Sequence, residues 1–230
     1  MLYAIADLHL SIGLEKGKPM DIFGDNWTGH HMRIKENWSK LIKEEDTVLI
    51  PGDLSWAMDM EDFLPDLAYV HDLPGKKIII SGNHDYWWNS TSKLNNLYDE
   101  IFFLKNSFAV YKDFHICGTR GWVSPGDAYF TLQDMKIYKR ELNRLKLSLD
   151  SAMCDGAKRI VVMFHYPPFS DKKEPSGFVD IIREYPVEKA IYGHLHGSSF
   201  RYAVCGEIDG VDYRLVSSDY MDFVPYKVLD

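Results

Sequence analysis

The chain has 230 residues, of which 46% are hydrophobic and 26% are charged. It is therefore long enough to bury a substantial core, as one large domain or two small ones. Its 26 basic and 34 acidic residues give a net charge of −8, which argues against broad binding of nucleic acid or of an anionic membrane through a basic face.

Short apolar runs alternate with amphipathic stretches along the chain, and no Ser-, Gly- or Pro-rich linker divides them. Residues 11–29 show no periodicity and are expected to form an excursion loop. In chain order, the apolar pattern predicts a strand over 2–6, a helix over 31–45, a strand over 47–50, a helix over 59–72, a strand over 76–81, a helix over 90–99, strands over 107–112 and 113–118, a helix over 130–154, strands over 159–164 and 190–192, and a closing hairpin of 201–207 with 211–216. We expect these elements to form a single mixed α/β domain over residues 1–230.

The sequence carries no segment that would insert into a membrane. Its apolar runs are far shorter than the ~18–20 residues of a membrane-spanning helix, and its first residues lack the basic and apolar regions of a signal peptide. Cys117, Cys154 and Cys205 form no metal-binding spacing and are expected to be small buried residues. These features predict a cytoplasmic protein without a membrane partner.

Side chains that can bind metals collect where the predicted strands end. Five segments carry them, namely Asp7-Leu8-His9, Gly52-Asp53, Gly82-Asn83-His84-Asp85, His165 and Gly193-His194-Leu195-His196. Ligands of open α/β sheets bind beyond the carboxyl ends of the strands, so these segments are expected to meet. Residues two apart in an extended segment point to the same side, which would pair Asp7 with His9 and His194 with His196. Carboxylate, imidazole and amide ligands together suit divalent transition metals.

These five motifs, in this order, resemble those of the calcineurin-like metallophosphoesterase superfamily. They extend over residues 7–196, so the resemblance covers most of the chain. It implies a two-layer mixed β-sandwich flanked by helices and a dinuclear centre of two divalent metal ions. The residue types leave Mn, Fe, Zn, Ni and Co open as the metals.

The resemblance also implies the ligands of the two ions. One ion would take Asp7, His9 and His196, the other would take Asn83, His165 and His194, and Asp53 would bridge both. The implied reaction is hydrolysis of a phosphate ester by a metal-bound hydroxide. The centre would then attract phosphate in spite of the net negative charge of the chain.

His84 and Asp85 belong to the same motif but have a different implied role. In the family the histidine lies beside the metals, so we expect His84 to act as the general acid or as a hydrogen-bond donor to phosphate. Asp85 is expected to orient or polarise the His84 ring, with capping of a following helix as the alternative.

Further residues near the motifs are candidates for substrate contact. Arg120 follows a predicted strand and is flanked by glycines, and its guanidinium suits bidentate binding of phosphate. The alternative is a surface ion pair. His30 opens a predicted helix and is a second candidate for substrate binding. Tryptophans also follow the motif segments and could fill the core or form the wall of a pocket, at positions 56, 87, 88 and 122.

The motifs leave the substrate open. A phosphorylated small molecule or a nucleotide is expected, with a phosphomonoester equally allowed. The alternative is a phosphodiesterase acting on cyclic nucleotides or nucleic acid. A non-catalytic binding scaffold with the same fold is a hypothesis of another class, and the presence of Asp53, Asn83 and His84 argues against it.

Overall fold

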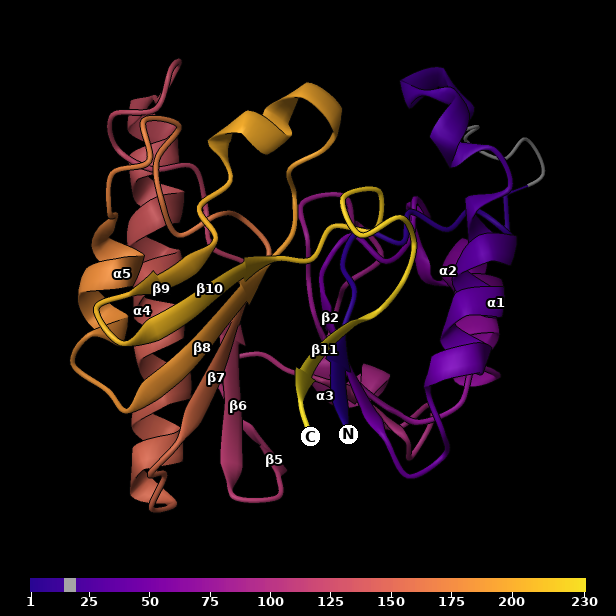
Figure 1. Cartoon of the computed structure of the whole chain (residues 1–230), viewed down its shortest axis with the longest axis horizontal. Coiled ribbons are helices and arrows are strands. Elements are labelled where there is room, and N and C mark those ends of the chain that lie inside the picture. Colours follow the sequence, from indigo (N-terminus) through magenta and orange to yellow (C-terminus); the bar gives the residue numbers. More distant parts are fainter. Residues whose placement is uncertain (15–19) are drawn as a thin grey trace.

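Two mixed β-sheets lie face to face, and helices cover their outer faces (Figure 1). The computed structural model describes residues 1–14 and 20–230, and residues 15–19 of the expected excursion loop lie outside the described residues. In the described part of that loop, two short 3-10 helices precede the first α-helix, η1 (Met20–Phe23) and η2 (Asp25–Trp27).

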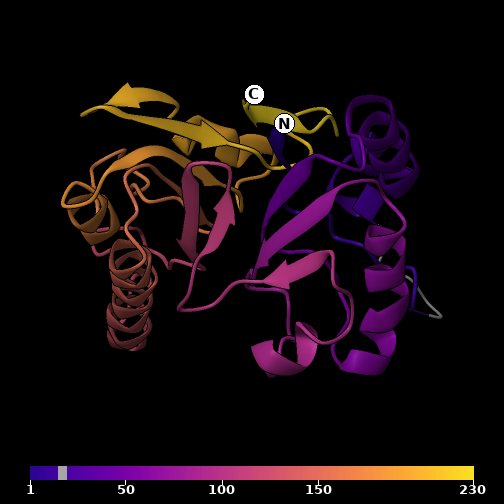
Figure 2. The same cartoon turned by 90° about the horizontal axis from the view of Figure 1, so that it is seen from below.

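The first sheet has the strand order β11-β1-β2-β3-β4. Its members are β1 (Leu2–Ala4), β2 (Thr47–Pro51), β3 (Lys76–Ile80), β4 (Ile101–Phe103) and β11 (Tyr226–Leu229). The first four are parallel, and β11 adds an antiparallel edge beside β1. This edge brings the two ends of the chain together (Figure 2).

The second sheet has the strand order β5-β6-β7-β8-β10-β9. Its members are β5 (Ala109–Tyr111), β6 (Phe114–Thr119), β7 (Ile160–Phe164), β8 (Val187–Tyr192), β10 (Val211–Leu215) and β9 (Gly206–Ile208). The four central strands are parallel, and β5 and β9 are antiparallel edges. All the carboxyl ends of the parallel strands therefore lie at one end of their sheet.

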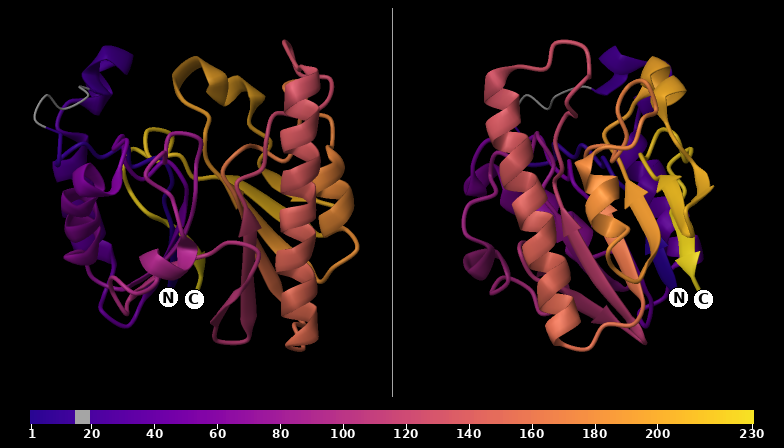
Figure 3. Two further views of the ribbon diagram at one scale, coloured as in Figure 1. Left: turned by 180° about the vertical axis from the view of Figure 1, so that it is seen from behind. Right: turned by 90° about the vertical axis from the view of Figure 1, so that its left-hand side faces the viewer.

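Helices α1 (His30–Leu41) and α2 (Met60–His71) flank the first sheet, and α4 (Leu132–Cys154) and α5 (Gly177–Ile182) flank the second. The long helix α4 runs across the outer face of its sheet (Figure 3). It begins at a capping box in which Thr131 and Asp134 satisfy each other's backbone amides. The remaining helices are α3 (Thr91–Leu94) and the 3-10 helix η3 (Gly197–Tyr202).

The alternation of side chains along the central strands builds three apolar layers. In β2, Leu49 faces the other sheet, whereas Val48 and Ile50 face α1 and α2. In β7, Val161 and Met163 face the first sheet, and the other residues of the strand face α4 and α5. Because both faces of β2 and β7 are covered, these two strands are apolar almost throughout rather than alternating with polar residues.

The expected fold class, a helix-flanked sandwich of two mixed sheets, is confirmed. The short elements differ from expectation. The sequence did not predict β4, β11 or α5, whose three to six residues are too few to show a period. The predicted helix over 90–99 is confined to α3, and the predicted strand over 201–207 is replaced by η3 and β9. Of the cysteines, Cys117 is buried as expected, but Cys154 and Cys205 are exposed.

Candidate metal centre

The five motifs lie where β1, β2, β3, β7 and β8 end, so residues from both sheets meet at one edge of the sandwich. Hydrogen bonds join the sheets at this edge. Nδ1 of His165, after β7, lies 3.0 Å from the carbonyl oxygen of Pro51, at the end of β2. The amide of His194, after β8, donates to Oδ2 of Asp7, after β1, over 2.9 Å. The site is therefore built across the two sheets rather than on either one.

The backbone that aims these side chains is not extended, contrary to the expectation from the sequence. Asp7, His9, Asp53 and His194 have φ values of 59°, 45°, 51° and 72°, in the left-handed region. Asp and His occupy this region more readily than most residues. The ligand pairs converge because the chain turns sharply after each strand, and not because residues two apart share one side of a strand.

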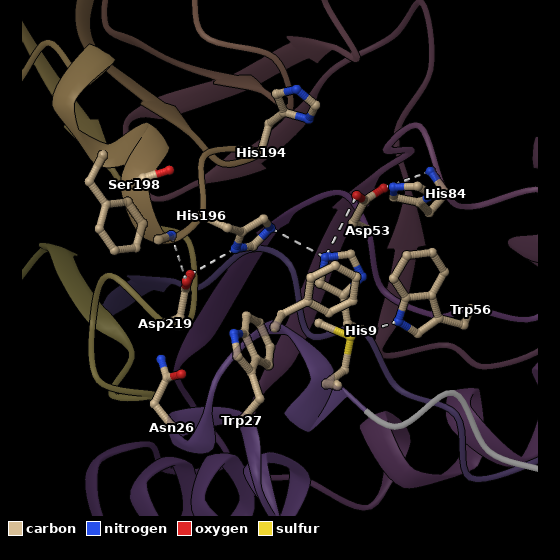
Figure 4. A pocket seen from close by; sticks show the side chains of 14 residues that line it. His9, Asn26, Trp27, Asp53, Trp56, His84, His194, His196, Ser198 and Asp219 are labelled. Atoms are coloured by element: carbon tan, nitrogen blue, oxygen red, sulfur yellow. Dashed lines mark hydrogen bonds and ion pairs between the residues drawn. The ribbon is translucent and has the colours of Figure 1, made fainter.

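One group of potential ligands consists of Asp7, His9 and His196, whose ligand atoms lie within 4.8 Å of one another. Nε2 of His9 is 3.3 Å from Nε2 of His196 (Figure 4). The same Nε2 of His196 is 3.9 Å from Oδ1 of Asp7. These are the residues that the resemblance assigns to one ion.

A second group consists of Asp7, Asp53 and His165. Nε2 of His165 is 3.4 Å from Oδ2 of Asp53, and Nδ1 of the same ring is 3.6 Å from Oδ1 of Asp7. The other two expected ligands contact this ring as well. Oδ1 of Asn83 lies 2.8 Å and Nδ1 of His194 lies 3.3 Å from Nε2 of His165. All seven expected ligands are thus brought together.

The donor atoms of this cluster suit divalent cations. Oδ1 of Asp7 is buried and has no hydrogen-bond partner among the described residues. Burial raises the pKa of Asp7 to about 7, which reflects negative charge that the protein alone does not balance. Burial lowers the pKa of His165 to about 3, so this ring is neutral and one of its nitrogens has a lone pair available to a metal. The cluster therefore fits metal ions that would balance the charge of its carboxylates.

Two positions of the motifs must be glycine because a carboxylate lies close to the backbone there. A Cβ atom at position 82 would lie 2.0 Å from Oδ1 of Asp53, and one at position 193 would lie 2.6 Å from Oδ2 of Asp7. Each glycine therefore makes room for a carboxylate of the candidate centre.

Asp85 occupies a different position from the expected one. Its carboxylate accepts hydrogen bonds from four backbone amides, those of Asp53, Leu54, Ser55 and Gly82, over 2.7–3.3 Å. Burial raises the pKa of Asp85, and the amide hydrogen bonds oppose that rise. Asp85 therefore connects the loop after β2 to the loop after β3, and so positions Asp53 and Asn83. Its carboxylate oxygens accept from these backbone amides rather than from the His84 ring.

His84 lies beside the cluster. Its amide donates to Oδ1 of Asp53 over 2.8 Å, and its ring centroid lies 4.3 Å from that of Trp56. The ring lines the same cleft as Asp53 (Figure 4). His84 is thus placed to contact a group bound next to the potential ligands.

Asp219 is a residue of the site that the sequence reasoning missed. It follows β10, and its Oδ1 lies 2.8 Å from Nδ1 of His196 (Figure 4). Its Oδ2 accepts from the amide of Gly197 over 3.3 Å. The signal that identified the other motifs, a polar residue after a buried strand, was also present here.

Arg120 and His30 lie next to the seven clustered residues, and the backbone carbonyl of Arg120 accepts from the amide of His165 over 3.1 Å, but their side chains have other partners. The Arg120 side chain is 3.6 Å from Glu141, which is fully buried, and stacks on Trp122 at 4.6 Å. The ring nitrogens of His30 each lie 3.1 Å from a backbone carbonyl oxygen, one of Trp27 and one of Leu8. The side-chain contacts of both residues described here are therefore with groups other than the seven expected ligands.

Two clefts open beside the candidate centre. The larger has a volume of about 370 Å³ and lies between η1, η2 and η3, with His9, Asp53, His84, His194 and His196 among its lining residues. The smaller has a volume of about 180 Å³ and is also lined by His194. Two tryptophans highlighted in the sequence line these clefts, Trp56 the larger and Trp122 the smaller. Trp87 instead fills the core, stacked on Phe63.

Among the described residues, the structure contains no helix with the length and apolar character needed to cross a membrane.

Two known proteins are similar to this chain in amino-acid sequence. The chain is 24% identical over 179 residues to a protein named probable cyclic nucleotide phosphodiesterase from Ruthia magnifica subsp. Calyptogena magnifica, across 72% of this chain and 69% of that protein. It is 31% identical over 80 residues to the gene 66 protein of Mycobacterium phage L5, across 35% of this chain and 37% of that protein.

Among solved structures, the fold is similar to that of the phosphopantetheinyl hydrolase of Mycobacterium tuberculosis. The TM-score is 0.53 and the identity 17%, across 94% of this chain and 88% of that chain, which shows a likeness of fold alone. A family model described as calcineurin-like phosphoesterase matches residues 2–198. Since that match extends from β1 past the last of the five motifs, the chain belongs to the calcineurin-like phosphoesterases and is a hydrolase of phosphoester bonds.

Proposed function

We propose that this chain hydrolyses a small phosphate ester at a centre of two divalent metal ions. The proposed ligands come from five strand ends, namely Asp7, His9, Asp53, Asn83, His165, His194 and His196. The observation that carries the proposal is the convergence of these side chains around a buried carboxylate oxygen of Asp7 that has no hydrogen-bond partner among the described residues.

The chemistry of the donors supports two sites rather than one. Asp7 belongs to both groups of potential ligands, and Asp53 lies 3.4 Å from His165 and 3.9 Å from His9. A carboxylate has two oxygens, so one that faces both groups can serve both ions. When bound, two such ions make a water molecule nucleophilic near neutral pH and neutralise charge on the phosphoryl oxygens.

The protein's own side chains have complementary tasks in this proposal. His84 borders the cleft beside Asp53, where it can donate a proton to the leaving oxygen or a hydrogen bond to the phosphoryl group. Asp85 and Asp219 have a supporting task. They position Asp53 and His196 by the hydrogen bonds described above.

The test combines metal analysis with hydrolysis of p-nitrophenyl phosphate and bis-p-nitrophenyl phosphate. We expect about two divalent ions per chain after loading with Mn²⁺, and hydrolysis that a chelator abolishes and Mn²⁺ restores. Full activity in the chelator would contradict the metal centre. Absence of turnover with every divalent ion tried would favour a binding scaffold of the same fold.

A further inference from the structure

The two clefts beside the candidate centre meet at one side chain. His194 lines both, and its Nδ1 is 3.3 Å from Nε2 of His165 within the group of potential ligands. A phosphoryl group held at this centre therefore has two separate spaces beside it. Each space can take one substituent of the phosphorus atom.

Both spaces have walls that suit apolar or aromatic groups. Trp27, Trp56 and Phe200 line the larger cleft, and Phe23 at its rim is 63% exposed. Trp122 and Tyr202 line the smaller cleft. Exposed aromatic surface beside a polar centre is typical of a binding site for an organic group.

The charges around these spaces disfavour a substrate with several negative charges. None of the described residues that line either cleft is Lys or Arg. The carboxylates there are Asp53 and Asp219 in the larger cleft and Asp127 and Asp171 in the smaller. An organic group that carries a further phosphate would meet these carboxylates without a cationic side chain among the described lining residues, whereas an uncharged organic group would meet no like charge.

We propose that the substrate is an acyclic phosphodiester whose two organic groups occupy the two clefts. The larger group would contact Trp27 and Phe200, and the smaller would contact Trp122 and Tyr202. In hydrolysis, water forms a new bond to phosphorus, one ester P–O bond breaks, and a proton goes to the departing oxygen. A cyclic nucleotide has both ester oxygens on one sugar, so it leaves one cleft empty. This inference rests on the proposed function and specifies its substrate.

The experiment compares substrates that share one leaving group. The full chain, loaded with Mn²⁺, is assayed with bis-p-nitrophenyl phosphate and with methyl p-nitrophenyl phosphate, each corrected for its uncatalysed rate. We expect kcat/KM to fall at least about tenfold when the second aromatic group is reduced to methyl, because an apolar cleft is left unfilled. p-Nitrophenyl phosphate and 3′,5′-cyclic AMP are expected to be poorer substrates than bis-p-nitrophenyl phosphate.

Variants assign each group to its cleft. Phe200→Ala in the larger cleft and Tyr202→Ala in the smaller should both raise KM for bis-p-nitrophenyl phosphate. With the methyl ester, one of these two effects should disappear. Leu132→Ala, which removes a side chain that is 87% exposed at the start of α4, is the matched control and should change neither constant.

Binding of diphenyl phosphate, measured by calorimetry, gives a readout that needs no turnover. It should exceed binding of phenyl phosphate and weaken in both cleft variants. Two outcomes would overturn the diester inference alone. One is an equal kcat/KM for the two p-nitrophenyl diesters with no effect of either variant. The other is faster hydrolysis of the monoester or of cyclic AMP than of bis-p-nitrophenyl phosphate. Failure to hydrolyse any ester with any divalent ion would instead contradict the proposed function, and the binding measurement would still report on the clefts.

Discussion

Asp219 permits a direct test of how the candidate metal centre is held in shape. Its carboxylate is 2% exposed and lies 2.8 Å from Nδ1 of His196, which leaves Nε2 of that ring facing His9 and Asp7. A carboxylate in this position fixes the ring orientation and makes the imidazole a stronger metal ligand. Asp219→Asn keeps the size of the side chain and removes its charge.

The size of the expected loss in metal affinity follows from two effects of the Asp219 charge. Loss of such a partner weakens metal binding by ~10–100-fold, or ~1.4–2.7 kcal/mol. The same charge also favours a proton on the metal-free ring. Burial by itself lowers the pKa of His196, but the hydrogen bond to Asp219 and the charge of Asp7 raise it to about 9. An ion that binds His196 below pH 9 must therefore displace a proton.

These effects give the variant a distinctive pH dependence. Between pH 7 and 8.5, wild-type affinity for Mn²⁺ should rise more steeply with pH than that of Asp219→Asn, by about one proton per binding event. The loss of affinity should therefore be largest at the alkaline end. Titration against a fluorescent chelator under argon measures both affinities.

The control is Asp222→Asn, in the same C-terminal segment. The Asp222 side chain is 91% exposed and contacts Arg33 at 3.8 Å, away from the cluster. This control should match the wild type at each pH. Equal affinity and equal pH slope in wild type and Asp219→Asn would refute the positioning role of Asp219.

Four further predictions follow from particular contacts. Asp53→Asn should lower the content of both metals, as measured by elemental analysis, because the shared carboxylate loses its charge; a content of two ions per chain would contradict the bridge. His84→Ala should retain the metals and slow hydrolysis by ~10²–10⁴-fold, least for esters with good leaving groups; an equal loss across leaving groups would indicate phosphate binding instead of acid catalysis. Gly82→Ala would place a Cβ atom 2.0 Å from Oδ1 of Asp53, so metal content should fall while circular dichroism still reports a folded chain. Lys77 is buried, and burial lowers its pKa to about 8, so the unfolded chain binds more protons than the folded chain between pH 8 and 10. Over this range the free energy of unfolding of the wild type should rise with pH by up to ~3 kcal/mol relative to Lys77→Met, as measured by urea denaturation.

The amino-acid sequence by itself determined the chemistry of the site. The ligand types, their order and their positions after apolar runs are local features of the chain, and they marked five segments. The family resemblance implied which seven residues of these segments would be ligands, and the structure brings these seven together. Long apolar or amphipathic segments such as β7 and α4 were predictable for the same local reason.

Only the tertiary structure decided which side chains contact one another at the site. Asp85 binds the backbone of a loop 31 residues away in sequence, and Asp219 contacts His196 from 23 residues further along the chain. These contacts join loops that follow neighbouring strands, β2 with β3 in the first sheet and β8 with β10 in the second, and no local pattern encodes which strands are neighbours. The clefts have the same origin, because their walls combine η2, η3 and the loops after β6 and β7. The sequence therefore specified a phosphoesterase centre, and the packing of the two sheets shaped the spaces beside it.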